Sequence, residues 1–313
     1  MSMPTDRLPR QSVTRPAASA LRRWFDSAAD QVTGDDANRI DWLRVVPFVA
    51  MHLGCLAVLW VGWSPFAVGL AVALYFIRMF AITAFYHRYF SHRAFRTGRI
   101  AQFLFAVLGA AAVQRGPLWW AAHHRHHHAH ADEQGDVHSP RQGFFWSHIG
   151  WFLTTANFKT REGRVPDLMR FPELRFLDRY DALVPLLLAV ALLALGTLLN
   201  RTAPQLGTSG WQLLVWGFCI STVALYHLTF TVNSLAHRFG TRRFHTSDDS
   251  RNNWLIALVT LGEGWHNNHH HCPSAARQGF RWWEVDVTYY LLRVLALAGL
   301  IWDLRPFRIQ RSG

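Results

Sequence analysis

Residues 66–92 read FAVGLAVALYFIRMFAITAFYHRYFSH, an apolar run that leads directly into two histidines. An α-helix needs about 20 predominantly apolar residues to cross the hydrocarbon core of a bilayer, and the part from 66 to 85 meets that length. Three other runs approach or exceed it, at 45–63, 182–199 and 211–232. A large soluble protein can bury one such helix. Four in a chain of 313 residues predict an all-α integral membrane protein with four transmembrane helices.

The distribution of charge predicts how these helices are oriented. The net charge is +12, Lys159 is the single lysine, and the connectors at 63–65 and 200–210 carry almost no charge. Several arginines precede the first apolar run: Arg7, Arg10, Arg15, Arg22, Arg23, Arg39 and Arg44. Because basic residues gather on the cytoplasmic side of a membrane, both chain ends and the histidine-rich segments are expected there. The basic balance thus reflects topology, and we expect no nucleic-acid partner.

The sequence predicts that the chain is divided into three regions, and it leaves the placement of two further apolar helices ambiguous. Residues 1–40 are expected to form a mobile basic arm without a signal peptide, 41–305 the membrane domain, and 306–313 a short tail. ALRRWFDSA (20–28) is expected to rest on lipid headgroups. The run at 100–120 is long enough to span, but Arg115, Gly116 and Pro117 favour a shallow helix. The run at 287–302 is short and contains Arg293, which predicts an amphipathic helix lying on the membrane.

Histidines cluster at 87–92, 123–130 and 266–271, all at the predicted cytoplasmic face. His87 and His92 are five positions apart, so on an α-helix they share a face only if the helix ends between them. The second and third clusters each contain the pattern HxxHH, whose i, i+3, i+4 spacing lines one helical face. A cytoplasmic helical cap carrying these clusters is therefore expected.

These clusters offer more imidazoles than one metal ion needs. Neutral imidazole binds Fe, Zn, Cu and Ni, and one zinc ion takes about four ligands. Eight histidines in the three clusters favour a dinuclear, nitrogen-rich site. A carboxylate-bridged bundle site would need two ExxH pairs, and Glu263 to His266 is the only ExxH pair in the sequence.

Several blocks of sequence are specific in both order and spacing: AITAFYHRYFSHRAF (81–95), HRHHH (124–128), GDVHSPRQGFFWSHIGW (135–151), NSLAHRFG (233–240) and GEGWHNNHH (262–270). From about residue 40 to about residue 305 the chain resembles the integral-membrane fatty-acyl desaturases, particularly the stearoyl-CoA (Δ9) branch. The resemblance implies a centre of two iron ions ligated mainly by histidine.

Carried over position by position, the resemblance implies these metal ligands: His87, His92, His124, His127, His128, His237, His266, His269, His270 and, through water, Asn233. Other histidines match no ligand position and are expected beside the centre or on the surface: His123, His126, His130, His138, His148 and His271. His227, deep in the fourth span, is expected to pack against a polar neighbour.

Two further sets of residues are candidates for supporting roles. Asp132, Asp136 and Glu263 are candidates to hold ligand imidazoles through the second ring nitrogen, with a solvated loop carboxylate as the alternative. Tyr75 and Met79, which precede His87 on the second span, are candidates to close a substrate tunnel. Ordinary helix packing is the alternative for both.

The implied reaction removes two hydrogens from an unactivated methylene pair, which requires O₂ activated at a redox metal and two electrons from a donor. We therefore expect a fatty-acyl desaturase that introduces a cis double bond at Δ9. A membrane hydroxylase with the same metals and a membrane metal transporter are the alternatives. A transporter is disfavoured because its ligands should lie in mid-membrane.

The sequence departs from the animal-type pattern at the carrier site. Ala122 and His123 stand where an Arg-Asp pair associated with CoA is found. Acyl-CoA remains the expected carrier, and chains bound to phospholipid or carrier protein stay open. The sequence has no haem-binding HPGG segment, so a separate ferredoxin, cytochrome b5 or reductase is expected to dock on the cytoplasmic arginines.

Overall fold

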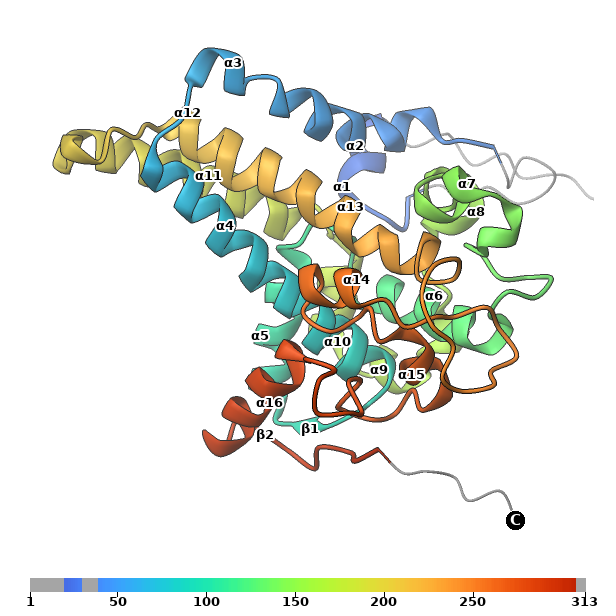
Figure 1. Ribbon diagram of the computed structural model, residues 1–313. Coiled ribbons are helices and arrows are strands. Elements are labelled where there is room, and N and C mark those ends of the chain that lie inside the picture. Colours follow the sequence, from blue (N-terminus) through green and yellow to red (C-terminus); the bar gives the residue numbers. More distant parts are fainter. Residues whose placement is uncertain (1–19, 30–38, 308–313) are drawn as a thin grey trace, which may run out of the picture.

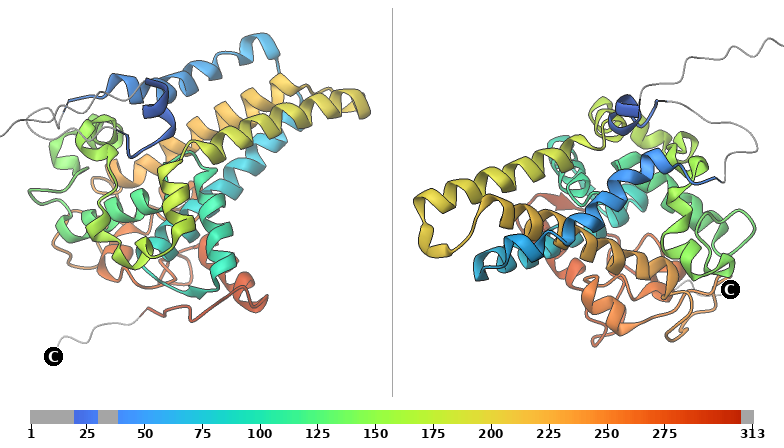
Figure 2. Two further views of the ribbon diagram at one scale, coloured as in Figure 1. Left: turned by 180° about the vertical axis from the view of Figure 1, so that it is seen from behind. Right: turned by 90° about the horizontal axis from the view of Figure 1, so that it is seen from above.

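The computed structural model describes residues 20–29 and 39–307, and the parts of the predicted arm and tail at 1–19, 30–38 and 308–313 lie outside these ranges. Four helical units are long and apolar enough to cross a membrane: Trp42–Val61, Pro65–Ser91, Leu183–Thr202 and Gly210–Ser234. They coincide with the four predicted spans, which confirms the predicted fold class. Figures 1 and 2 show them projecting together from one end of a helical cap.

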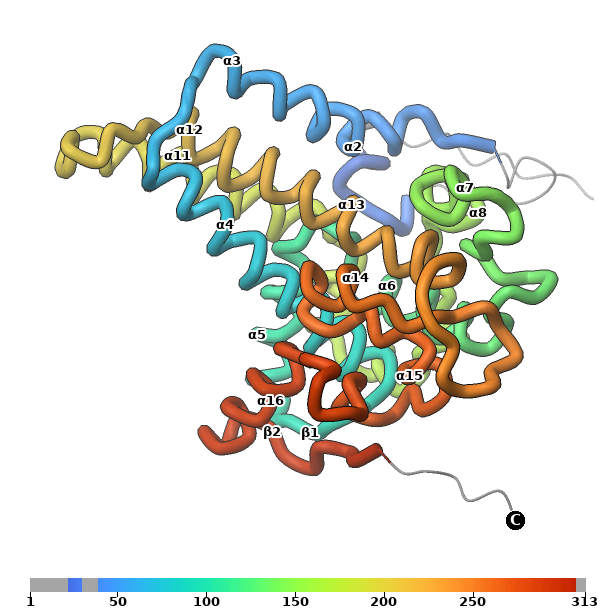
Figure 3. Tube along the Cα trace, in the orientation of Figure 1, coloured from blue at the N-terminus to red at the C-terminus, as the bar shows by residue number. Residues whose placement is uncertain are grey.

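Each long unit is built from one to three helical elements. These are α2 (Trp42–Cys55) with α3 (Val58–Val61), α4 (Pro65–Phe80) with η2 (Ala81–Ser91), α11 (Leu183–Thr202), and α12 (Gly210–Leu213) with η7 (Leu214–Ile220) and α13 (Ser221–Ser234). The first two are joined by a tight turn, in which Gly62 has a φ of 65° and the Ser64 hydroxyl caps α4. In Figure 3 the trace of α4 continues without a break into the cap.

Polar side chains inside the spans are satisfied by one another, as a medium without water requires. Buried Arg78 donates to the hydroxyls of Thr222 and Ser221. His227 lies 3.1 Å from His52 and 3.1 Å from His148, measured between ring nitrogens. The expectation that His227 packs against a polar neighbour is confirmed, and the chain of three imidazoles ties α2 and the cap to α13.

The cap consists of short helices and one small pair of strands that are distant in sequence. The helices of the cap are α5 (Arg99–Ala110), α6 (Pro117–His130), η3 (Pro140–Gln142), α7 (Phe144–His148), η4 (Gly150–Leu153), α8 (Thr155–Phe158), η5 (Glu162–Arg164), α9 (Pro166–Met169), α10 (Pro172–Arg179), α14 (Trp254–Val259), α15 (His266–His271) and α16 (Val287–Leu297). One further short helix, η6 (Pro204–Leu206), lies outside the cap and connects α11 to α12 at the far end of the spans. Strands β1 (Arg96–Thr97) and β2 (Ile301–Trp302) pair antiparallel.

The ambiguous run at 100–120 does not form a fifth span. Helix α5 has 12 residues and stops short of the span length, and the chain then bends through Val113 and Arg115, both at positive φ, before α6 begins. Helix α16 has 11 residues and keeps Tyr290, Val294 and Leu297 exposed. An apolar face with no protein partner suits the predicted position on the membrane surface.

Residues 20–29, part of the predicted arm, pack against the start of the first span. Helix α1 (Ala20–Phe25) places Trp24 so that its indole N–H donates to the Leu43 carbonyl at 2.7 Å. Arg23 pairs with Asp41 at 2.5 Å, and Asp26 pairs with Arg179 at 2.9 Å. These contacts hold this stretch at the mouth of a cavity described below.

The glycines of the stretch 262–265 allow α14 and α15 to approach closely. Gly262 has a φ of +128°, and a Cβ at Gly264 would lie 2.1 Å from the Ala257 nitrogen and 2.3 Å from the Asn253 oxygen. Both neighbours are backbone atoms, which cannot rotate away. The third histidine cluster therefore depends on the absence of a side chain at this position.

We predict that Gly264→Ala destabilises the protein by about 1–3 kcal/mol, the usual cost of overpacking a filled site. Thermal unfolding of the detergent-solubilised protein measures the effect. Gly163→Ala is the matched control, because a Cβ there meets nothing within 4 Å. Equal melting temperatures for the two variants would contradict this account of the turn.

Candidate metal centre

The first histidine pair converges because the end of the second span is a π-helix. In η2 the hydrogen bonds join residues five apart, and the chain continues the pattern with the His92 N–H donating to the His87 carbonyl at 3.3 Å. Positions five apart therefore stack, and the two ring centroids lie 5.0 Å apart. The helix does end between them, at Ser91, but the sequence argument assumed α-helical geometry and missed this cause.

The other histidines are positioned by α6, α15 and the end of α13. Helix α6 is held at its start by Asp178, whose carboxylate accepts from the Trp119 N–H at 2.7 Å. Helix α15 begins directly after the glycine turn, and His237 follows α13 by three residues. Segments far apart in sequence thus bring their imidazoles to one place in the cap.

The nine predicted histidine ligands form two adjacent groups, each with its ligand nitrogens within 4.8 Å of one another. The first group is His87, His92, His124, His128 and His269. The second group is His127, His237, His266 and His270. Each HxxHH pattern, whose spacing predicted one ligand-bearing helical face, contributes to both groups. In each pattern the histidines at i and i+4 belong to one group, and the histidine at i+3 belongs to the other.

The inward-facing nitrogens are arranged as ligands to a cation. In the first group the Nε2 atoms lie 3.0 Å apart for His87 and His269, and 2.9 Å apart for His269 and His128. The spacing is 3.1 Å for His128 and His124, and 2.8 Å for His124 and His92. Two nitrogens about 2.1 Å from one ion and at right angles to each other would be about 3.0 Å apart.

The second group supplies a matching observation. The Nε2 atoms of His127 and His270 are buried and have no hydrogen-bond partner among the described residues. Buried polar nitrogens without a partner are costly unless something satisfies them. The residues present therefore fit two metal ions, one at each group.

Acceptors behind the rings direct the Nε2 atoms inward. Nδ1 faces Glu263 in His87, Asp136 in His127 at 3.1 Å, and Asp132 in His237 at 2.7 Å. Each of the three predicted carboxylates thus contacts Nδ1 of a predicted ligand histidine. A fourth, Asp248, was missed by the sequence analysis and lies 2.8 Å from Nδ1 of His270. A carboxylate at Nδ1 fixes the tautomer that leaves Nε2 free for metal.

Burial and the neighbouring imidazoles keep most ligand rings neutral. They hold the pKa of His92, His124 and His128 well below the ordinary imidazole value, and do the same for His266 and His269. A neutral ring is the form that binds metal.

The carboxylates behind the rings stay ionised. Burial opposes ionisation of Asp132, but the hydrogen bond and charge of His237 outweigh it and lower the pKa of that carboxyl. The same balance, with His270 as the partner, lowers the pKa of Asp248. The pKa values of the Asp136 and Glu263 carboxyls are lowered as well, and four negative carboxylates beside the two histidine groups match the charge of two divalent ions.

Histidines outside the predicted ligand set lie outside both groups. His123 faces the Trp119 carbonyl with its Nδ1 at 3.0 Å, His126 faces the Gly135 carbonyl at 3.0 Å, and His271 stacks on Phe244. The remaining three are placed as follows: His130 beside the His126 carbonyl, His138 beside the ring of His127, and His148 beside Ser234. Asn233 lines both cavities next to the centre.

Two cavities meet at the centre. The larger, of about 410 Å³, has apolar walls rich in aromatic side chains and runs from Arg23 and Arg44 to His124 and Asn233. The smaller, of about 40 Å³, is lined by histidines of both groups and by Met79. Of the two tunnel candidates, Met79 thus lines a cavity, whereas Tyr75 lines neither and donates to the Val259 carbonyl at 2.6 Å.

A family model for fatty acid desaturases matches residues 39–302. The chain belongs to the fatty acid desaturase family. It is 40% identical over 278 residues to a protein of Arabidopsis thaliana named as a probable chloroplastic lipid desaturase, a match that covers 87% of this chain and 73% of the relative. The sn-1 stearoyl-lipid 9-desaturase of Anabaena variabilis is 36% identical, with coverage of 85% and 94%. An acyl-CoA C20 Δ5-desaturase of Anemone leveillei is also 36% identical, with coverage of 88% and 85%.

Membership establishes an oxidoreductase of lipid metabolism that acts on fatty-acyl substrates with O₂. It also agrees with the predicted membrane location of the desaturase. The names of the relatives differ in double-bond position and acyl carrier, so these two properties need separate arguments.

We predict that Asp248→Asn lowers the affinity of this desaturase for metal about 10–100-fold, the usual effect of removing a hydrogen-bonding group behind a ligand histidine. Metal content of the purified variant after dialysis against graded chelator measures it. Asp249→Asn is the matched control, because the Asp249 side chain pairs with Arg141 rather than with a histidine. The assignment fails if both variants retain metal equally.

Proposed function

We propose that this desaturase introduces a cis double bond at Δ9 of a saturated acyl chain, using two iron ions. The ions would be held by the nine histidines of the two groups, with Asn233 reaching one of them through water. The observation that carries the proposal is the meeting of both groups with the end of an aromatic cavity. On the charge argument from the sequence, the cap faces the cytoplasm.

The donor set favours iron over zinc. Five imidazoles surround the first position, whereas zinc takes about four ligands and cannot change oxidation state. Iron in such a site would supply the oxidant, made from O₂ and two external electrons, that an unactivated C–H bond requires.

The protein's own contribution is to position the chain and exclude water. Trp120, Thr229 and Asn233 line both cavities, so an acyl chain passing from the larger to the smaller crosses in front of the histidines. Phe48, Phe152 and Phe230 pack against one another along the way, with ring centroids 5.1–5.5 Å apart in adjacent pairs. Rigid aromatic walls hold a flexible chain in one register, and that register selects which carbon pair reacts.

The cavity favours a lipid-linked acyl chain over the acyl-CoA expected from the resemblance. Its lining includes Met51, Phe218 and Leu186, and Leu186 is 46% exposed on the lipid-facing side of α11. A chain still attached to a membrane lipid could enter there sideways. Two arginines at the cavity mouth already have carboxylate partners, Arg23 with Asp41 and Arg115 with Asp181, both at 2.5 Å. The name of the Anabaena relative, a stearoyl-lipid 9-desaturase, supports both the carrier and Δ9.

We predict that a desaturase-deficient host expressing this chain accumulates a new cis monoene, found by gas chromatography with mass spectrometry. His266→Ala should abolish it and lower iron content while the protein still inserts in membrane, because a ligand of the second group is lost. His271→Ala, whose ring stacks on Phe244 instead, is the matched control and should keep activity.

The same experiment separates the alternatives. A hydroxylated acyl chain in place of the monoene would show that the protein is a hydroxylase. Full activity of the His266→Ala variant would contradict the assignment of the metal centre. After a pulse of labelled stearate, a labelled monoene that appears first in glycerolipid supports the lipid carrier. A labelled monoene that appears first in the acyl-CoA pool supports acyl-CoA as the carrier.

We predict that Met79→Ala extends the accepted chain beyond the double bond by about two carbons, because the buried side chain lines the smaller cavity. One added methylene in an apolar pocket changes selectivity about 10–200-fold, so the shift is measurable as a ratio of products. Tyr75→Phe is the control: it removes a hydroxyl that faces Val259 and should leave the product lengths unchanged. Identical product distributions for Met79→Ala and the unmodified protein would remove Met79 from the tunnel.

A further inference from the structure

One surface segment is bonded directly to the outer side of the second histidine group. The Asp248 carboxylate lies 2.8 Å from Nδ1 of His270. The next residue, Asp249, donates its backbone N–H to the Asp132 carboxylate at 2.9 Å. Asp132 in turn accepts from His237 at 2.7 Å. Two consecutive residues thus connect the surface to two ring nitrogens of the proposed centre, each through one or two hydrogen bonds.

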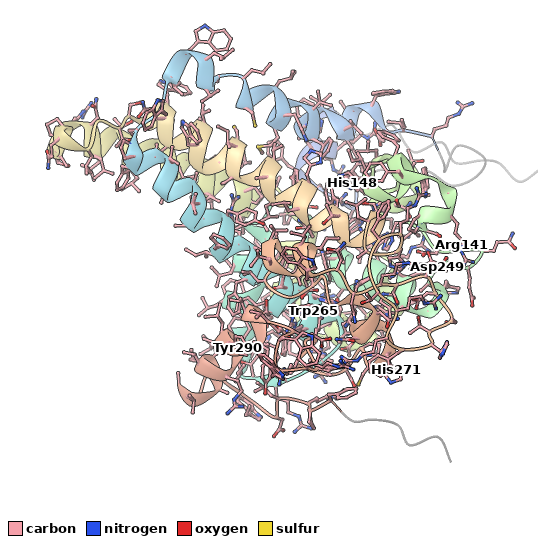
Figure 4. The ribbon with its side chains drawn as sticks, in the orientation of Figure 1. Arg141, His148, Asp249, Trp265, His271 and Tyr290 are labelled. Carbon is pink, nitrogen blue, oxygen red and sulfur yellow. The ribbon has the colours of Figure 1, made fainter. Side chains whose placement is uncertain are left out.

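This segment is surrounded by arginine. Arg141 pairs with Asp249 at 2.8 Å, and Arg242 lies 3.9 Å from the same carboxylate. The side chain of Arg141 is 58% exposed, that of Asp249 37% and that of Arg242 35%. Arg238 is exposed and Arg251 half-buried nearby in the chain. Figure 4 shows Arg141 and Asp249 together at the edge of the cap, on the side away from the spans.

Arg141 and Arg242 flank the Asp249 carboxylate, Arg238 donates to the carbonyl of Pro140 next to Arg141, and Arg251 donates to the carbonyl of Gly240 close to Arg242. This patch (Arg141, Arg238, Arg242, Arg251 and Asp249) therefore carries four positive charges and one negative charge. Other exposed arginines are arranged differently. Arg96 pairs with Asp303, Arg99 pairs with Glu173, and Arg93 shares Asp167 with Arg125. In the part of the chain that the structure describes, none of these carboxylates contacts a histidine of the two groups, whereas Arg88, which does reach Glu263, is fully buried.

We infer that this patch is the docking surface for a small acidic protein that carries one electron at a time. The inference rests on the proposed function, in which one saturated carbon pair, O₂, two electrons and two protons give one double bond and two waters. The two electrons come from two reduced carriers, each oxidised by one electron. Through Asp248 and Asp249, a carrier bound at the patch would lie one or two hydrogen bonds from His270 and His237.

The test uses the full-length protein in detergent with a plant-type [2Fe–2S] ferredoxin as the probe. The charge-reversing double variant Arg141→Glu/Arg242→Glu should raise both the Kd and the KM for reduced ferredoxin about tenfold or more, with kcat changed less than twofold. The effect should shrink as salt is raised, because exposed charges are screened. Arg242→Lys keeps the charge and should remain close to the unmodified protein.

Arg96→Glu is the matched control, since it makes the same charge change at an exposed arginine away from the patch. It should leave the Kd for ferredoxin unchanged. Equal Kd values for the double variant and the unmodified protein, with ferredoxin and again with soluble cytochrome b5, would overturn the inference. So would an equal loss of binding in Arg96→Glu.

A single-turnover measurement separates docking from damage to the centre. The protein is reduced chemically without a carrier, freed of reductant and then exposed to O₂. The double variant should form as much product per metal centre as the unmodified protein, and a loss here would show a structural effect and overturn the inference. Absence of product from the unmodified protein would instead count against the proposed function, while the binding data would still report on the patch.

Discussion

Nine imidazole nitrogens face one another in the interior of the cap, and the rest of the structure depends on that arrangement. Lone pairs brought within about 3 Å repel unless cations lie between them, so each ring must be held in place from behind. Glu263, Asp136, Asp132 and Asp248 do this at Nδ1, and each carries a negative charge into a buried region. Bound metal ions would thus relieve the repulsion between the ring nitrogens and balance the charge of the carboxylates, and both sets of side chains would hold the metal ions.

Irregular backbone in the cap follows from this requirement. A regular α-helix cannot bring the rings of His87 and His92 together, whereas a π-helix, a rare element that often occurs at functional sites, does so here. Asp132, which holds His237, has a φ of 58°, a conformation that costs an ordinary residue free energy. Leu261, with the same φ, begins the turn that delivers the third histidine cluster. Both of these strained residues lie where a histidine ring is positioned, and the packing of neighbouring residues has to maintain their backbone conformation.

The sequence predicted what depends on composition and local spacing. Apolar length located four spans, and the resemblance named nine histidines that the structure collects into two groups. Spacing could not divide HxxHH between two sites, because that division depends on where the facing helices lie. Asp248 lies in a polar loop, TSDDS, with no spacing that relates it to His270. The cavity walls come from helices far apart in sequence, so lining residues such as Leu186 carried no local signal.

The position of the centre at the ends of the spans satisfies two opposed demands. The acyl chain is apolar and belongs in the hydrocarbon region, which the larger cavity reaches between α2 and α11. Electrons on a protein carrier arrive from the aqueous side, where a charged surface can attract the carrier. A centre in mid-membrane would be far from the carrier, and one on the outer surface of the cap would be far from the lipid. Placing the histidines where α4 and α13 enter the cap leaves the substrate cavity on one side and Asp248 and Asp249 on the other. This is why the ligands come from the last turns of spans and from the cap helices, and from nowhere deeper among the described residues.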